Sequence, residues 1–215
     1  MKRSFFAAMG FLSAFAVWTA IVSYVDVRAI GPLGSRVGLS SLNGFVHSLT
    51  GVHMSLYTLT DWLGLIPVAV GFGFAMLGFA QWIRRKSITK VDRDLLVLGG
   101  FYIITAGTYL LFENVVINYR PVLIGGVLEA SYPSSTTLLV LCVMPTAIMQ
   151  LNTRIKHTIL RRCTACAITA FIIFTVSARL ISGVHWVTDI IGSTLLSAGL
   201  VLLYRSFSRP ISNKS

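Results

Sequence analysis

Six long apolar runs, separated by short polar segments, dominate the pattern of the chain. They occupy approximately residues 5–25, 62–83, 95–117, 133–151, 163–183 and 184–204. Each run is close to the roughly 20 residues that an α-helix needs to cross the hydrocarbon core of a bilayer. The first run is also longer than the roughly 7 to 15 apolar residues of a secretory signal. The pattern predicts an all-α membrane bundle of six transmembrane helices.

The stretch from Asp26 to Thr60 does not follow this pattern. It contains the turn-forming residues Gly31-Pro32-Leu33-Gly34 and then a segment rich in Ser, Thr and Leu that starts at Leu39. We predict that this stretch lies at the membrane interface and does not span the bilayer.

Composition excludes an ordinary soluble domain. Apolar residues make up 55% of the chain and charged residues 12%, whereas charged residues are about a quarter of a typical soluble domain. The length of 215 residues suits a single membrane domain over residues 1–215. The three cysteines, Cys142, Cys163 and Cys166, all lie in apolar runs, which predicts packing in the protein core with no disulfide framework or metal site.

The formal net charge of +11 raises the question of a nucleic-acid partner, but the positions of the basic residues indicate membrane orientation. If the six helices alternate in direction, every Lys and Arg except Arg28, Arg36, Arg120 and Arg179 falls on one side. Basic residues collect on the cytoplasmic side of membrane proteins. We therefore predict a multi-pass cell-membrane protein with both termini cytoplasmic, no nucleic-acid partner, and extracytoplasmic loops at 26–61, 117–133 and 180–186.

Polar residues from three distant loops converge on the predicted outer surface. They are Glu113, Arg120, Pro133-Ser134-Ser135-Thr136, Arg179, His185 and Asp189. Ionisable residues in membrane segments are costly and are usually functional. The guanidinium groups of Arg120 and Arg179 match the geometry of phosphate oxygens. The segment from Pro133 to Thr136 is typical of a helix start, with Pro in the first turn and free N–H groups that suit an anion.

His185 and Asp189 are four residues apart and therefore share one face of a helix. In this arrangement the carboxylate can hold one imidazole N–H and leave the other ring nitrogen free to attack phosphorus. A helix-surface pair without chemistry is the alternative. The presence of Arg179, Arg120 and the Ser-rich helix start on the same side favours the catalytic interpretation.

These motifs resemble the signatures of the type 2 phosphatidic acid phosphatase family. Residues 177–189 read SARLISGVHWVTD, and their spacing from Arg179 to His185 and Asp189 matches the third family signature, which reads S-R, five residues, H, three residues, D. Arg120-Pro121 resembles the R-P that closes the first signature. Pro133-Ser134-Ser135-Thr136 resembles the second signature, P-S-G-H. The signature region covers residues 113–189.

The resemblance implies an all-helical fold and hydrolysis of a phosphate ester through a phosphohistidine, without a metal or other cofactor. By this resemblance His185 is the nucleophile and Asp189 orients it. The phosphate ligands are then Arg120, Arg179, Ser134 and the backbone N–H of Ser135. The expected partners are the bilayer and a lipid phosphate substrate.

The sequence departs from the family pattern at several positions. Glu113 stands where the first signature has Lys, and Thr136 stands where the second has the His that serves as general acid. Ser135 and Ala178 replace a Gly and a Ser. General acid catalysis contributes typically 10²- to 10⁴-fold in rate, so the loss of that His bears directly on the reaction.

Three interpretations accommodate these departures. A diphosphate substrate leaves as a phosphate, which needs less protonation than an alkoxide. Alternatively, another group supplies the proton, either Glu113 if burial raises its pKa, or His47 or His53 from the first outer loop. The third interpretation is a protein that binds a phospholipid head group without hydrolysing it.

The leading hypothesis is a bacterial-type membrane phosphatase that hydrolyses a polyprenyl diphosphate, such as undecaprenyl diphosphate, or a phospholipid phosphate at the extracytoplasmic face. The alternative is a non-catalytic phospholipid-binding or lipid-moving membrane protein. Asp61 and Glu129, also on the predicted outer side, are interpreted as solvated surface residues, with contact to a head-group amine as the other possibility. A vanadate haloperoxidase has a related anion site but is soluble, which the composition of this chain excludes. A transporter would be expected to show paired broken helices, and the sequence shows none.

Overall fold

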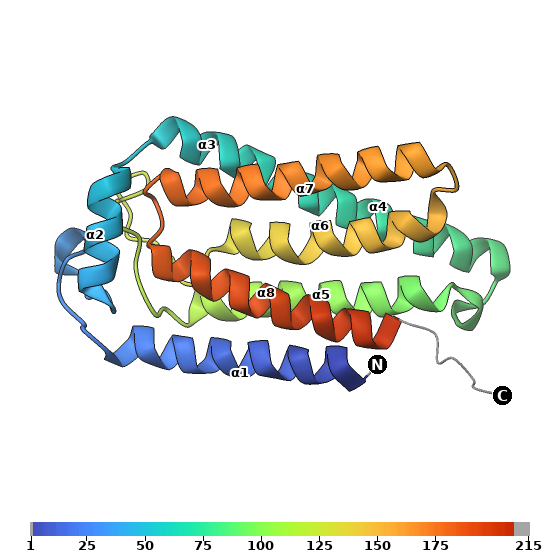
Figure 1. Cartoon of the computed structure of the whole chain (residues 1–215), viewed down its shortest axis with the longest axis horizontal. Helices are drawn as coiled ribbons and strands as arrows, with labels where there is room; N and C mark the ends of the chain where they lie inside the picture. Colours follow the sequence, from blue (N-terminus) through green and yellow to red (C-terminus); the bar gives the residue numbers. More distant parts are fainter. Residues whose placement is uncertain (1, 209–215) are drawn as a thin grey trace.

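The computed structural model describes residues 2–208, which form a bundle of long helices (Figure 1). The helices are α1 (Lys2–Tyr24), α2 (Ser40–Thr50), α3 (Met54–Leu63), α4 (Leu65–Arg85), α5 (Arg93–Asn114), α6 (Ser135–Arg154), α7 (Thr158–Ile181) and α8 (Val187–Ser208), with short 3₁₀ turns at Pro32–Gly34 and Ile88–Lys90. Among the described residues, six helical segments are long and apolar enough to span a membrane, with α3 and α4 counted as one. The predicted all-α bundle with six spans is confirmed.

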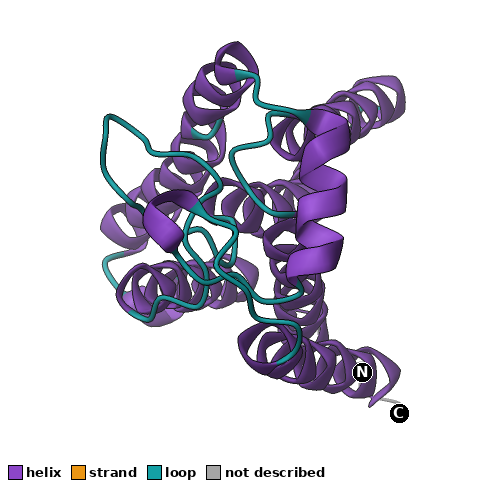
Figure 2. Ribbon diagram, turned by 90° about the vertical axis from the view of Figure 1, so that its left-hand side faces the viewer, coloured by secondary structure: helices purple, strands orange, loops and turns teal. Residues whose placement is uncertain are grey.

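The start of α1 and the end of α8 lie at the same end of the bundle (Figure 1). At the opposite end, α2 crosses the ends of the long helices, and the loops between helices gather beside it (Figure 2). This arrangement agrees with an even number of spans. The cytoplasmic location of the termini remains a prediction.

Helices α6 and α8 form the centre of the bundle. In their most apolar windows 56% and 61% of the residues are buried, compared with at most 22% in the other four spans. Small hydroxyl side chains let the two backbones approach each other, as in many membrane helix pairs. Ser193 donates a hydrogen bond to the backbone oxygen of Ser134 at 2.9 Å. The core therefore positions the start of α6 against the start of α8.

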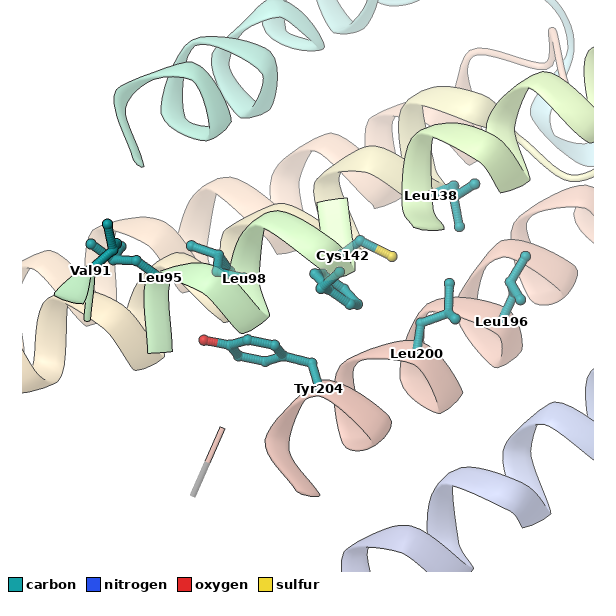
Figure 3. Packing of buried hydrophobic residues seen from close by; sticks show 9 residues of the cluster. Val91, Leu95, Leu98, Leu138, Cys142, Leu196, Leu200 and Tyr204 are labelled. Atoms are coloured by element: carbon teal, nitrogen blue, oxygen red, sulfur yellow. The ribbon is translucent and has the colours of Figure 1, made fainter. Parts of the chain in front are cut away.

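An apolar cluster fills the space between α5, α6 and α8 (Figure 3). It includes Leu98 of α5, Leu138 and Cys142 of α6, and Leu200 and Tyr204 of α8. The predicted core location of Cys142 is confirmed. For the other two cysteines the prediction is wrong, because Cys163 and Cys166 are exposed on α7. A membrane-spanning helix can be apolar on every face, so an apolar residue in it need not point into the protein core.

The stretch before α4 differs from the sequence prediction. We expected the second span to begin at about Trp62, but helix α3 already starts at Met54 and continues through Gly64, which has right-handed helical backbone angles, into α4. Together they form a candidate span of 32 residues. The polar residues of α3 face other polar groups at the end of the bundle, so a hydropathy pattern alone does not identify this helical extension.

The segment before α3 packs against the turn between α7 and α8. The backbone N–H of His53 donates to the carbonyl oxygen of Ser182 at 2.9 Å. Gly183 has a φ of +65°, and a Cβ atom there would lie 1.7 Å from the carbonyl oxygen of Gly51. Only glycine fits this close approach of two backbones. The first outer segment is thus fixed directly to the turn that carries His185.

Candidate active site

His185 lies in the turn between α7 and α8 and is 3% exposed. Its Nε2 atom is 3.2 Å from Nη1 of Arg120, and its Nδ1 atom is 3.5 Å from Oδ2 of Asp189. Because a guanidinium can only donate, Nε2 accepts and the ring proton is on Nδ1, on the side of the carboxylate. Burial, followed by the positive charges of Arg120 and Arg179, lowers the pKa of His185 well below its ordinary value. The imidazole is therefore neutral at pH 7.

Asp189 is fully buried in the first turn of α8. Its Oδ2 atom accepts a hydrogen bond from the backbone N–H of Trp186 at 2.9 Å, which is one half of a capping box. Asn43 of α2 steadies the same turn, because its Oδ1 accepts from the N–H of Thr188 at 3.3 Å and its Nδ2 donates to the Thr188 hydroxyl at 3.0 Å. The start of α8 thereby fixes the carboxylate beside His185.

Arg120 lies in a hairpin-like loop between α5 and α6. Its backbone N–H donates to the carbonyl oxygen of Glu129 at 3.0 Å, and the loop reverses at Gly125 and Gly126, whose φ angles are +58° and +82°. Two consecutive residues with positive φ are typical of a tight hairpin turn, which glycine forms without strain. Folding back of this loop brings the buried Arg120 side chain to His185.

Arg179 is 1% exposed in the last turn of α7. Its Nη1 donates to the carbonyl oxygen of Tyr57 at 3.4 Å and to the Thr60 hydroxyl at 3.2 Å, and its Nη2 is 3.6 Å from Oδ1 of Asp61. The Tyr57 ring faces both arginines, with its centroid 4.7 Å from Cζ of Arg179 and 5.6 Å from Cζ of Arg120. Among residues 2–208, no hydrogen-bond partner is found for the buried Nε of Arg179.

The contacts of α3 were missed by sequence reasoning. Tyr57, Thr60 and Asp61 are three and four residues apart, which places them on one helical face. Recognition of that spacing would have pointed to a helix with a polar face, but not to the arginine that it contacts. Asp61 and Glu129 were expected to be solvated, and their side chains are indeed 59% and 40% exposed, but the sequence did not predict that each also pairs with an arginine; Oε2 of Glu129 is 3.0 Å from Nε of Arg120.

The start of α6 lies beside the start of α8, as its role in the site would require. Ser134 is the residue before the helix, is fully buried, and accepts a hydrogen bond from the Thr137 hydroxyl at 3.0 Å. Its N–H approaches the carbonyl oxygen of Asp189 at 3.4 Å. The helix begins at Ser135, so the expected position of Pro133 in the first turn is wrong. The helix start itself is confirmed, with unpaired first-turn N–H groups expected by helix geometry.

Two of the residues that depart from the family pattern, Thr136 and Glu113, lie at the edge of this site. Thr136 is 7% exposed and packs against the junction of α3 and α4, where a Cβ on Gly64 would lie 3.2 Å from its Cγ2. Glu113 is exposed and lines a small cavity together with Ser135. The condition on which Glu113 was considered as a proton donor, burial, is not met.

His47 and His53 have different surroundings. The His47 ring packs on that of Trp186, with centroids 5.4 Å apart, and burial lowers the pKa of His47. Trp186 in turn donates from Nε1 to the carbonyl oxygen of Tyr119 at 2.7 Å, which joins the His185 turn to the Arg120 hairpin. His53 is exposed, and its ring nitrogen is 2.9 Å from the carbonyl oxygen of Thr50.

A family model for the PAP2 superfamily matches residues 102–211, which is about half of the chain. The chain belongs to the PAP2 superfamily. The family resemblance proposed from the three signatures is thus confirmed. A transmembrane PAP2-type phosphatidylglycerolphosphate phosphatase from Bacillus subtilis, solved by crystallography, is similar in fold, with a TM-score of 0.54, 18% identity and coverage of 97% of this chain and 98% of that chain. No curated protein matches the chain.

Membership of the PAP2 superfamily indicates a membrane lipid phosphatase and leaves the roles of individual residues as predictions. The geometry brings together His185, Asp189, Arg120 and, through Tyr57, Arg179. Within residues 2–208, no group of three His, Cys, Asp or Glu side chains is placed to hold a metal ion. The arrangement is suited to nucleophilic attack by an imidazole on an anion held between guanidinium groups.

Proposed function

We propose that this PAP2-superfamily protein hydrolyses a lipid-linked phosphate or diphosphate at the extracytoplasmic face of the membrane, with His185 as the nucleophile. The observation that carries the proposal is the placement of the buried His185 ring, with Nε2 3.2 Å from Nη1 of Arg120 and Nδ1 3.5 Å from Oδ2 of Asp189. This placement suits a tautomer with the lone pair on Nε2 and the proton on Nδ1. A buried, neutral imidazole oriented by a carboxylate is the form that can attack phosphorus.

In the first step, Nε2 of His185 forms a bond to phosphorus while the bond from phosphorus to the leaving oxygen breaks. The developing imidazolium charge is stabilised by the carboxylate of Asp189 through the Nδ1 proton. Arg120, Arg179, Ser134 and the N–H of Ser135 stabilise the phosphoryl oxygens. In the second step, water attacks the phosphohistidine, the N–P bond breaks, and inorganic phosphate leaves with the lone pair restored to Nε2.

The position of the site supports a lipid substrate. The candidate residues lie in loops or in the terminal turns of α6, α7 and α8, where a head group would be at the membrane surface and its chains in the bilayer. The distribution of basic residues favours the extracytoplasmic side. A polyprenyl diphosphate and a phospholipid phosphate both fit, and the structurally similar Bacillus subtilis protein is named for a phospholipid phosphate.

The leaving group discriminates between these substrates. The Thr136 hydroxyl is too weak an acid to replace a histidine, and Glu113 is exposed. Without a positioned acid, departure of a phosphate from a diphosphate is easier than departure of an alkoxide. Of the other residues considered as proton donors to the leaving group, His47 lies close to the nucleophile, because its ring packs on that of Trp186, which follows His185 in the chain. A second candidate function, phospholipid binding without turnover, is favoured by the replacements at Glu113 and Thr136.

The test is phosphate release by the purified full chain in detergent from undecaprenyl diphosphate, phosphatidic acid, phosphatidylglycerophosphate and diacylglycerol diphosphate. His185→Ala should abolish release, and His157→Ala, at the other end of the bundle, is the matched control. Turnover that survives in His185→Ala would end the covalent mechanism. No turnover by the folded wild-type protein on any substrate, together with hydrolysis by Thr136→His, would favour the lipid-binding function.

A further inference from the structure

Each of the two candidate phosphate-binding arginines has a carboxylate partner. Nε of Arg120 is 3.0 Å from Oε2 of Glu129, and Nη2 of Arg179 is 3.6 Å from Oδ1 of Asp61. The arginine side chains are 9% and 1% exposed, whereas the carboxylates are 40% and 59% exposed. The cations are therefore buried, and their counter-charges lie between them and solvent.

The fold holds both carboxylates in place. Glu129 lies opposite Arg120 in the hairpin, where the Arg120 N–H donates to the Glu129 carbonyl oxygen at 3.0 Å. Asp61 is on the α3 face that also contacts Arg179 through Tyr57 and Thr60. The backbone of each carboxylate residue is therefore held beside its arginine.

The charges of these four side chains cancel. Two guanidinium groups contribute two positive charges, and Asp61 and Glu129 contribute two negative charges at neutral pH. Glu113, which lines the small cavity with Ser135, adds a further negative charge nearby. The neutral imidazole of His185 contributes none. An anion between Arg120 and Arg179 is thus attracted by two cations and repelled by the carboxylates, and the repulsion rises with the charge of the anion.

We propose that Asp61 and Glu129 are specificity-determining residues that lower the affinity of the site for phosphates in proportion to their negative charge. At the binding step they favour the phosphate monoester of a lipid over a diphosphate. This inference rests on the proposed function, because it takes phosphate to bind between the two arginines. Selection by charge opposes selection by leaving group, since a diphosphate is the easier substrate to cleave.

The test uses inorganic phosphate and pyrophosphate as soluble probes of different charge. Their dissociation constants are measured by isothermal titration calorimetry on the full chain in neutral detergent, for wild type, Asp61→Asn, Glu129→Gln and the double variant. These substitutions keep the size of each side chain and remove one charge. Asp26→Asn is the matched control, because Asp26 pairs with Arg28 at 2.9 Å in the same outer segment and contacts neither site arginine.

Each single substitution should tighten phosphate binding by about threefold to tenfold, and pyrophosphate binding by a larger factor, in low salt. The gain should shrink as ionic strength rises, because the carboxylates are partly exposed. Asp26→Asn should change both constants by less than about twofold, since Asp26 pairs with Arg28 and is not an ion-pair partner of either site arginine.

Three outcomes would overturn the inference. Weaker binding of both anions in Asp61→Asn and Glu129→Gln would show that the carboxylates only hold the arginines in place. An unchanged ratio of the two dissociation constants would show that they do not discriminate by charge. No binding of either anion by wild type or any variant would overturn the anion site itself, and with it the proposed function, whereas the first two outcomes leave the proposed function intact.

Discussion

Replacement of Asn43 by Ala tests how the first outer segment supports the start of α8. Asn43 is fully buried, and its side chain makes three hydrogen bonds. Nδ2 donates to the Gly38 carbonyl oxygen at 2.8 Å and to the Thr188 hydroxyl at 3.0 Å, while Oδ1 accepts from the Thr188 N–H at 3.3 Å. In Asn43→Ala the Thr188 N–H and the Gly38 carbonyl lose these partners inside the protein.

The expected loss follows from these two stranded backbone groups. A buried donor or acceptor left without a partner costs about 1–3 kcal/mol, so the two together should lower the free energy of unfolding by roughly 2–6 kcal/mol. At about 2–4 °C per kcal/mol for a chain of this size, the melting midpoint should fall by roughly 4–24 °C. Because Thr188 precedes Asp189, phosphate release should also fall.

The assay is thermal unfolding of the full chain in one detergent, followed by circular dichroism. Asn114→Ala is the matched control, because Asn114 is exposed and its side chain makes one local hydrogen bond, to the Leu110 carbonyl oxygen at 2.7 Å. That variant should unfold within about 2 °C of wild type, as expected for a surface change. Equal midpoints for Asn43→Ala and Asn114→Ala would refute the reasoning.

Three further predictions address the nucleophile and its surroundings. Gly183→Ala should lower the free energy of unfolding by more than about 2 kcal/mol, because its Cβ would collide with the Gly51 carbonyl at 1.7 Å; Gly73→Ala, with open space around it, should show no loss in the same melting assay. Since the pKa of His185 is lowered by folding, the unfolded chain binds more protons below about pH 6.5, the ordinary histidine pKa. The free energy of unfolding should then have its full value above that pH and decrease as pH falls, with a smaller pH slope in His185→Asn. An identical pH slope for this variant and wild type in urea titrations would contradict the prediction. Arg179→Lys should reduce phosphate release at least about tenfold, because an ammonium group cannot replace the forked guanidinium that contacts Tyr57, Thr60 and Asp61. Retention of wild-type kcat/KM would exclude a role for that geometry.

The membrane spans could be predicted because they follow from a one-dimensional property. Apolar runs of about 20 residues give helices whatever their neighbours are, and α5 and α8 end within four residues of the predicted boundaries. The stretch before α4 could not be predicted in this way. Helix α3 is stabilised by contacts with Arg179, which is more than a hundred positions away, and hydropathy does not record such contacts.

The candidate site was predicted in part for a related reason. The spacing of His185 and Asp189 predicted that they lie close together, which the structure confirms, but His185 lies in the turn before α8 and not on a helix face as expected. The three signatures located Arg120 and Ser134. The ion pairs of Asp61 and Glu129 were missed because each forms through tertiary folding, one by the reversal at Gly125 and Gly126 and the other by packing of α3 on α7. Exposed acidic residues are usually solvated, and nothing local distinguishes these two from the usual case.

The division of the site between the two halves of the chain bears on how such proteins diversify. The family model covers residues 102–211, yet Tyr57, Thr60 and Asp61, which brace Arg179, lie outside it. A helix that is free of the chemical step can change its sequence without loss of the nucleophile. Under the specificity role proposed for Asp61, two superfamily members with identical signatures can differ in head-group preference through this helix alone.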